Sequence, residues 1–147
     1  MRKAAGHLLS ILSFSPDGRW AVVQLYRLPF AGDAAAEFYL APLRQDDLAP
    51  RAEWTPLPVR TAFPAVPWSS GGNALYFFGD TPERDSIEIL PLDFAPKPIA
   101  GAGHTFYRFQ RPSFLVLEGG GLVAAGERLI FPALESKGNI WLMQLPR

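Results

Sequence analysis

The feature that most constrains the fold of this chain is a repeat marked by three glycines. Gly18, Gly72 and Gly126 stand at a constant interval of 54 residues, from 18 to 72 and from 72 to 126. Two residues after each glycine begins a short run rich in aliphatic and aromatic residues, and the three runs align without a gap. Short strands recurring at a period of roughly 40 to 55 residues are typical of β-propeller blades. The repeat therefore predicts an all-β fold built from equivalent sheets.

Each unit continues with a later strand after a connection of variable length. The first runs, which begin two residues after the glycines, are Trp20–Val23, Ala74–Phe77 and Arg128–Phe131. The later runs are Glu37–Leu43, Ser86–Leu92 and Asn139–Leu145. Variable length is expected where insertions are confined to a surface hairpin. The segments Trp54–Val59 and Pro96–Gly101 contain prolines, which cannot donate to the ladder of a sheet, so we expect them to be outermost strands.

These units predict one partial propeller domain over residues 1–147, made of antiparallel four-stranded meanders at about 7–62, 63–103 and 104–147. In the third copy, either Leu115–Leu117 or Leu122–Ala125 can be the innermost strand. After Leu145 the sequence leaves no residues for an outermost strand, so we expect an incomplete last blade. Because propellers have about four to eight blades, the chain is expected to be a piece of a larger propeller.

The first copy shows why a turn forms at the start of each unit. Pro16 presets the φ angle of the second position of a type I turn, and the hydroxyl of Ser15 can bond to the turn's own backbone. Gly18 tolerates the positive φ that closes such turns. We expect Asp17 to stabilise this turn rather than to bind a ligand.

Composition excludes several classes of function. The 14 lysines and arginines balance the 14 aspartates and glutamates, so the basic stripe of a nucleic-acid-binding protein is not expected. There is no cysteine, which removes disulfides, thiolate nucleophiles and cysteine metal sites. The sequence contains no run of about 18 apolar residues, so no membrane span is predicted, and the N-terminal residues are not expected to form a signal peptide. Periplasmic, extracytoplasmic and cytoplasmic locations all remain open.

Three segments carry a resemblance to a known family. Phe14–Trp20, Trp68–Phe77 and Gly138–Met143 resemble the WD-like blades of TolB-like six-bladed β-propellers. The repeat also looks like that of propellers appended to some bacterial serine/threonine kinases and transcriptional regulators. The likeness covers nearly the whole chain, and it implies that the chain is the C-terminal half of a larger propeller.

No residue is predicted to be catalytic, cofactor-binding or metal-binding, and no cofactor is expected. His7 and His104 lie in different blades without a ligand-spaced partner. The acidic segment Asp80–Asp85 lacks the ligand pattern of a calcium loop. Gly119–Gly121 is followed neither by a lysine with serine or threonine nor by a helix, so it is expected to be a turn rather than a phosphate site. A nucleophile elbow of the Gly-x-Ser-x-Gly type is absent from the sequence.

These observations predict a non-catalytic module that binds a protein or ligand, as a fragment of a multidomain bacterial signalling or envelope protein. The alternative is the accessory propeller of a serine hydrolase resembling the prolyl oligopeptidases, whose catalytic domain lies elsewhere. Trp54 and Phe106–Phe109 lie near blade junctions, where they either contact a partner or pack between blades. Open blade edges expose unpaired backbone groups, so we expect the chain to pair with the remainder of the propeller or with a second copy.

Overall fold

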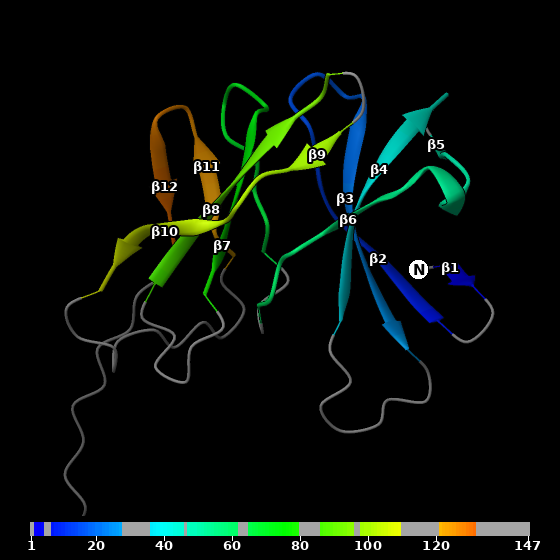
Figure 1. Ribbon diagram of the computed structural model, residues 1–147, viewed down its shortest axis with the longest axis horizontal. Helices are drawn as coiled ribbons and strands as arrows, with labels where there is room; N and C mark the ends of the chain where they lie inside the picture. The colour runs from blue at the N-terminus through cyan, green and yellow to red at the C-terminus, as the bar shows by residue number, and fades with distance from the viewer. Residues whose placement is uncertain are drawn as a thin grey trace, which may run out of the picture.

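The computed structural model of the chain describes residues 2–4, 7–27, 36–45, 47–61, 65–79, 86–95, 98–109 and 121–131. These residues form antiparallel sheets, joined by turns and by a single 3-10 helical turn, η1 (Arg51–Glu53). The sheets stand side by side (Figure 1), as partial propeller blades do. The predicted all-β fold class is confirmed.

The first sheet is an antiparallel meander. Its elements are β1 (Arg2–Ala4), β2 (His7–Phe14), β3 (Trp20–Arg27), β4 (Glu37–Arg44), β5 (Asp47–Leu48) and β6 (Thr55–Leu57). The strands β2, β3 and β4 pair in chain order, and β6 pairs with β4 as the outermost strand, which agrees with the prediction for the proline-bearing segment Trp54–Val59. The additional strand β1 pairs with β2 and was not expected from the repeat.

The second sheet repeats this arrangement, and a hairpin represents the third unit. The strands are β7 (Ala74–Phe78), β8 (Ser86–Asp93), β9 (Ile99–Ala100) and β10 (His104–Arg108), followed by β11 (Val123–Ala125) and β12 (Arg128–Ile130). An isolated bridge joins Trp68 to Leu75, so the segment before β7 occupies the place that β2 has in the first sheet. In the hairpin of β11 and β12, the strand that precedes Gly126 lies within Leu122–Ala125. The expected strands at Leu115–Leu117 and Asn139–Leu145 lie outside the described residues.

The repeat extends to the pairing register and to single hydrogen bonds. Phe14 pairs with Ala21, and the residues 54 positions later, Trp68 and Leu75, form the equivalent bridge. The amide of Leu43 donates to the carbonyl of Arg19, and Leu92 donates to Asn73, each across 2.8 Å. The three glycines of the repeat have φ values of 70°, 69° and 60°, in the left-handed region that favours glycine. The repeat seen in the sequence is therefore a repeat of backbone geometry.

In both sheets the outermost strand is divided into two pieces opposite a proline. Pro42 lies in β4 between the residues that pair with β5 and those that pair with β6. Pro91 lies in β8 between the residues that pair with β9 and those that pair with β10. The carbonyl oxygen of each proline accepts a 2.8 Å bond where the chain leaves the shorter piece, from Ala49 and Gly101 respectively. The prolines thus set where the outer edge is interrupted.

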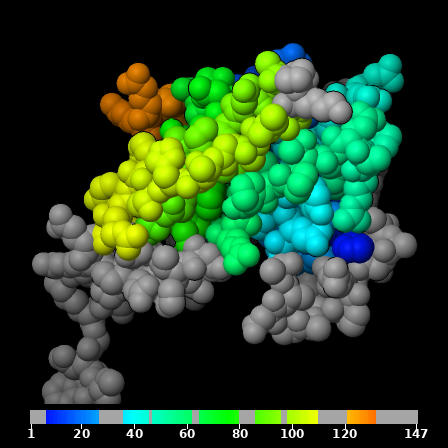
Figure 2. All heavy atoms as spheres, in the orientation of Figure 1, coloured from blue at the N-terminus to red at the C-terminus, as the bar shows by residue number. Residues whose placement is uncertain are grey.

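This pairing corrects one predicted boundary. The second blade was expected to end near residue 103, but β10 continues the second sheet to Arg108 because it pairs with β8. The predicted outermost strand at Pro96–Gly101 contains only the shorter piece, β9. Figure 2 shows β9 and β10 on the viewed face beside β6, where the hydroxyl of Thr55 lies 3.5 Å from the carbonyl oxygen of Pro98.

The hydrophobic core lies between the sheets. Alternate residues of neighbouring strands point to opposite faces, so each strand supplies two layers. The layer between the first and second sheets contains Val22, Phe38, Leu40, Leu57, Val59, Val66, Trp68, Leu75, Phe77, Leu90 and Leu92. The layer between the second sheet and the hairpin is built on Phe78, Ile87 and Leu122. Apolar packing between units therefore holds the sheets together.

Candidate functional site

A groove runs along the inner strands of all three units. It encloses about 560 Å³ and is lined by Leu12, Ser13, Phe14, Pro16, Ala65, Val66, Pro67, Trp68, Ser69, Ser70, Gly121, Leu122, Val123 and Ala124. These residues come from β2 and its turn, from the segment before β7, and from the start of β11. Because the three segments are equivalent positions of the repeat, the groove follows from the way the units are arranged.

One direct bond fixes the relative position of two of these inner strands. The hydroxyl of Ser13 donates to the carbonyl oxygen of Val66 across 2.6 Å, which joins the first unit to the second. The adjacent carbonyl of Pro67 accepts a 2.9 Å bond from Tyr76 of β7. The backbone at the floor of the groove is therefore held from two directions.

The lining of the groove is apolar and neutral. None of the residues that line it in the described part of the chain is an acid, a base or a histidine. Phe14 and Val123 remain 58% and 53% exposed, although both are large and hydrophobic. Solvated apolar side chains in a concave surface are typical of a site that binds an apolar group.

Trp68, which lines the groove, also carries a buried polar atom. Its side chain is 6% exposed, and its Nε1 has no hydrogen-bond partner within the described residues. Leaving a buried donor unpaired costs about 1 to 3 kcal/mol, so such atoms are rare in the core of a protein. Trp68 packs between the sheets and also lines the groove.

Asp17 makes its contacts inside its own turn. Its carboxylate accepts bonds from the Ser15 hydroxyl at 2.6 Å, from the Arg19 amide at 3.1 Å and from Arg19 Nε at 2.7 Å. These bonds, first that of Ser15 and then those of Arg19, lower the pKa of Asp17 from 3.8 to about 2. The turn borders a small hollow of about 180 Å³, shared with the turn of the second unit and with Trp20 and Phe94.

The other polar candidates do not converge. His7 lies on β2 opposite Arg27, and His104 lies exposed on β10 opposite Ile89, in a different sheet. Within the described ranges, no group of three or more histidine, aspartate or glutamate side chains could hold a metal ion. The acidic segment Asp80–Asp85 lies outside the described residues. The part of the chain that the structure covers also contains no helix long and apolar enough to cross a membrane.

The aromatic residues near the blade junctions divide into two groups. Trp54 packs within the first sheet, where its ring centroid lies 6.0 Å from that of Tyr39. Phe109 packs 5.4 Å from Phe131, in the layer between the second sheet and the hairpin. Phe106 and Tyr107 of β10 stay about half exposed, although Phe106 lies 5.4 Å from the ring of Tyr76 and Tyr107 lies 5.1 Å from that of Phe109. All four aromatic residues therefore pack against other rings, and Phe106 and Tyr107 also present surface to solvent.

Comparison with known proteins gives no match. No protein-family model matches the chain, and no curated protein or solved structure matches it.

Proposed function

We propose that this chain is a non-catalytic binding module, part of a TolB-like β-propeller, and that the groove along its inner strands binds the partner. The observation that carries the proposal is the groove itself, to which three equivalent segments of the repeat contribute. A concave, largely apolar surface with few polar groups is the usual form of a binding site. The absence of titratable groups from its described lining is consistent with binding rather than acid-base catalysis.

The chemistry of the lining defines the kind of partner that fits. Phe14 and Val123 offer apolar contacts at the rim, and Ser69 and Ser70 add hydroxyl groups to the same lining. A partner that combines an apolar side chain with a hydrogen-bonding backbone satisfies both features. A peptide segment of a protein has this combination at every apolar residue, so we favour a protein partner over a charged small molecule.

The proposal is tested by selecting random linear peptides displayed on phage against the full chain. The affinity of the selected peptides is then measured for the double variant Phe14→Ser with Val123→Ser. A matched control is Ile99→Ser with Phe106→Ser, because these residues are 56% and 55% exposed and lie outside the groove. We expect the groove variant to weaken binding by about tenfold or more, since exposed apolar anchors commonly contribute more than 1 kcal/mol. The control variant should bind within about twofold of the unchanged chain.

Equal losses in both double variants would contradict the groove as the site. Turnover of a ligand that a single substitution in this chain abolishes would contradict a non-catalytic module.

A further inference from the structure

The outward face of the first sheet is buried although it points away from the second sheet. Residues of β3 and β4 alternate between the two faces, and Val22 and Leu40 pack toward the second sheet. On the opposite face, Ala21, Val23 and Ala41 form a separate cluster and are each 0% exposed. In a propeller this face contacts the neighbouring blade. Another part of the chain must therefore cover it here.

The cover is the segment 47–54, which contains β5 and η1 and which we call the end cap. Leu48 and Trp54 of the end cap pack on the cluster together with Tyr39 and Leu43 of β4. The position of Trp54 is fixed by a 2.8 Å bond from its Nε1 to the carbonyl oxygen of Ala49. In Figure 1 the end cap lies on the side of β4 that faces away from β7 and β8.

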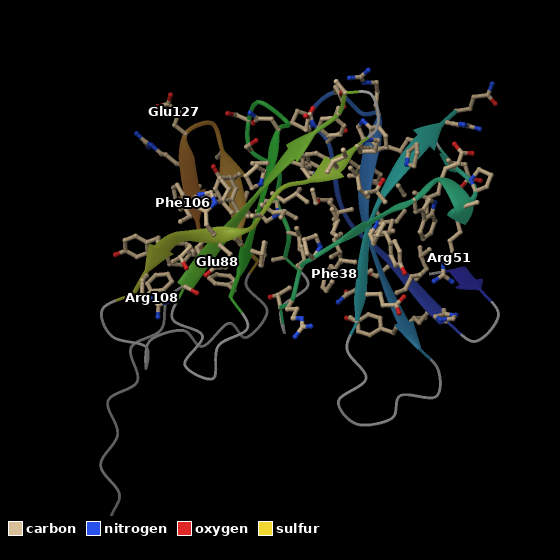
Figure 3. The ribbon with its side chains drawn as sticks, viewed as in Figure 1. Phe38, Arg51, Glu88, Phe106, Arg108 and Glu127 are labelled. Carbon is tan, nitrogen blue, oxygen red and sulfur yellow. The ribbon has the colours of Figure 1, made fainter. Side chains whose placement is uncertain are left out.

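The outer surface of the end cap is charged. The guanidinium of Arg51 lies 5.7 Å from the ring centroid of Tyr39 and 3.7 Å from the carboxylate of Glu37. Arg44 at the end of β4 pairs with Glu53. Figure 3 shows Arg51 at the side of the molecule opposite Glu88 and Phe106. A layer of solvated ions over an apolar cluster is what a surface exposed to water requires, and it resists the docking of another apolar face.

The second sheet shows what a unit without such a cover looks like. Both of its faces are buried by neighbours, one by the first sheet and the other by the hairpin of β11 and β12. Where the first sheet inserts residues 49–54 between the two pieces of its outer strand, the second sheet has only residues 101–103. The end cap thus occupies a position of the repeat at which the two units differ in length.

We propose that the end cap closes the outward face of the first sheet, so that another blade or a second copy of this chain docks there only after the end cap is displaced. Stacked repeats require end units that cover their own outer apolar face, and this segment meets that requirement. Two copies can then complete a six-bladed ring only if the end cap is displaced, because such a ring needs the outward face of each first sheet as a contact.

The experiment measures access to a single introduced thiol, which is possible because the chain has no cysteine of its own. Val23→Cys places the thiol under the end cap, and Val22→Cys places it one residue away on the face toward the second sheet. Ser70→Cys gives the exposed reference. Both buried thiols should react with a maleimide more slowly than the reference by on the order of 100-fold, as expected for groups exposed only by local opening.

Trp54→Ala is then added to each cysteine variant. We expect the labelling rate of Val23→Cys to rise toward that of Ser70→Cys, while Val22→Cys stays protected. This difference separates removal of the end cap from loss of the whole fold, which would expose both thiols. The proposal is overturned if Val23→Cys labels as fast as the reference while Trp54 is present, if Trp54→Ala leaves its rate unchanged, or if both thiols become reactive together.

Discussion

The first and second sheets share the turn that opens their central strands and differ in their outer halves. In both, a serine accepts the amide that opens the next strand: Ser15 from Trp20 at 2.9 Å and Ser69 from Ala74 at 3.1 Å. The outer halves differ because residues 49–54 of the end cap separate the two pieces of the outer strand in the first sheet, whereas only residues 101–103 separate them in the second. The repeat is therefore specified by the inner strands and turns. The outer connection differs between the units, and in the first sheet it covers the face on which a neighbouring sheet would pack.

The largest effect should come from the layer between the sheets. Leu75→Ala removes a side chain with no exposed surface from that layer and should lower the free energy of unfolding by about 3 kcal/mol. Leu48→Ala removes the same atoms from the half-buried cover of the outward face and should cost only about 1 kcal/mol. Urea denaturation measures both. Equal losses would show that the end cap contributes to stability as much as a neighbouring sheet does.

The repeated glycines should give the next largest effect. Gly18→Ala and Gly72→Ala each force a side chain into a left-handed φ and should each cost about 1.5 kcal/mol. An added Cβ meets nothing within 4 Å at Gly18 and only an ordinary contact with Pro16 at Gly72, so φ rather than crowding sets the cost. Gly71→Ala is the control, because this neighbour has no positive φ and its added Cβ would meet at 3.3 Å only the end of the flexible Asn73 side chain. A loss at Gly71 as large as at Gly72 would remove φ as the explanation.

The two turn serines should contribute less. Ser15→Ala and Ser69→Ala each leave a strand amide without its 2.9 or 3.1 Å acceptor and should each cost about 1 kcal/mol. The loss should be larger at Ser15, which is 6% exposed, than at the half-buried Ser69, because water replaces the lost partner less readily at a buried site. Thermal unfolding of both variants measures the order, and a larger loss at Ser69 would contradict it.

The smallest expected effect is a difference in acid sensitivity between the turns of the first and second sheets. Asp17 has a pKa of about 2 in the folded chain and 3.8 in its ordinary state, so its ionised form stabilises the fold above pH 3.8. This contribution disappears as the pH falls from 3.8 towards 2. In the second turn the Ser69 hydroxyl donates instead to the neutral amide oxygen of Asn73.

Urea denaturation at a series of pH values distinguishes the two turns. Asp17→Asn should remove this part of the acid sensitivity, whereas Asn73→Ala should leave it in place. An unchanged acid profile in Asp17→Asn would show that other carboxylates account for the sensitivity.

The sequence allowed the repeat, the turns and the strands after each glycine to be predicted, because these depend on local requirements. A left-handed φ needs glycine, and a buried strand needs a run of apolar residues. The extent of the second sheet could not be predicted in the same way. Gly101 and Gly103 look like a boundary between units, and every residue of β10 is exposed, so its pairing with β8 leaves no hydrophobic pattern.

The groove and the end cap depend on tertiary contacts that have no local signal. The groove is formed by segments that lie 54 residues apart in the chain, and each of them alone reads as an ordinary strand. The end cap consists of three charged residues, a proline, two alanines, a leucine and a tryptophan, a composition compatible with a surface loop. The pairing of β5 with β4, the bond from Trp54 to Ala49 and the cluster beneath it distinguish this segment from a loop.

The interrupted outer strands also affect how the protein behaves at high concentration. Fibril growth needs a long, continuous row of free amides and carbonyls against which an incoming chain can align. Pro42 and Pro91 divide the outer layer of each sheet into short pieces that cannot share one straight register. The outer edge of each of these two sheets is therefore too short a template for amyloid-like addition.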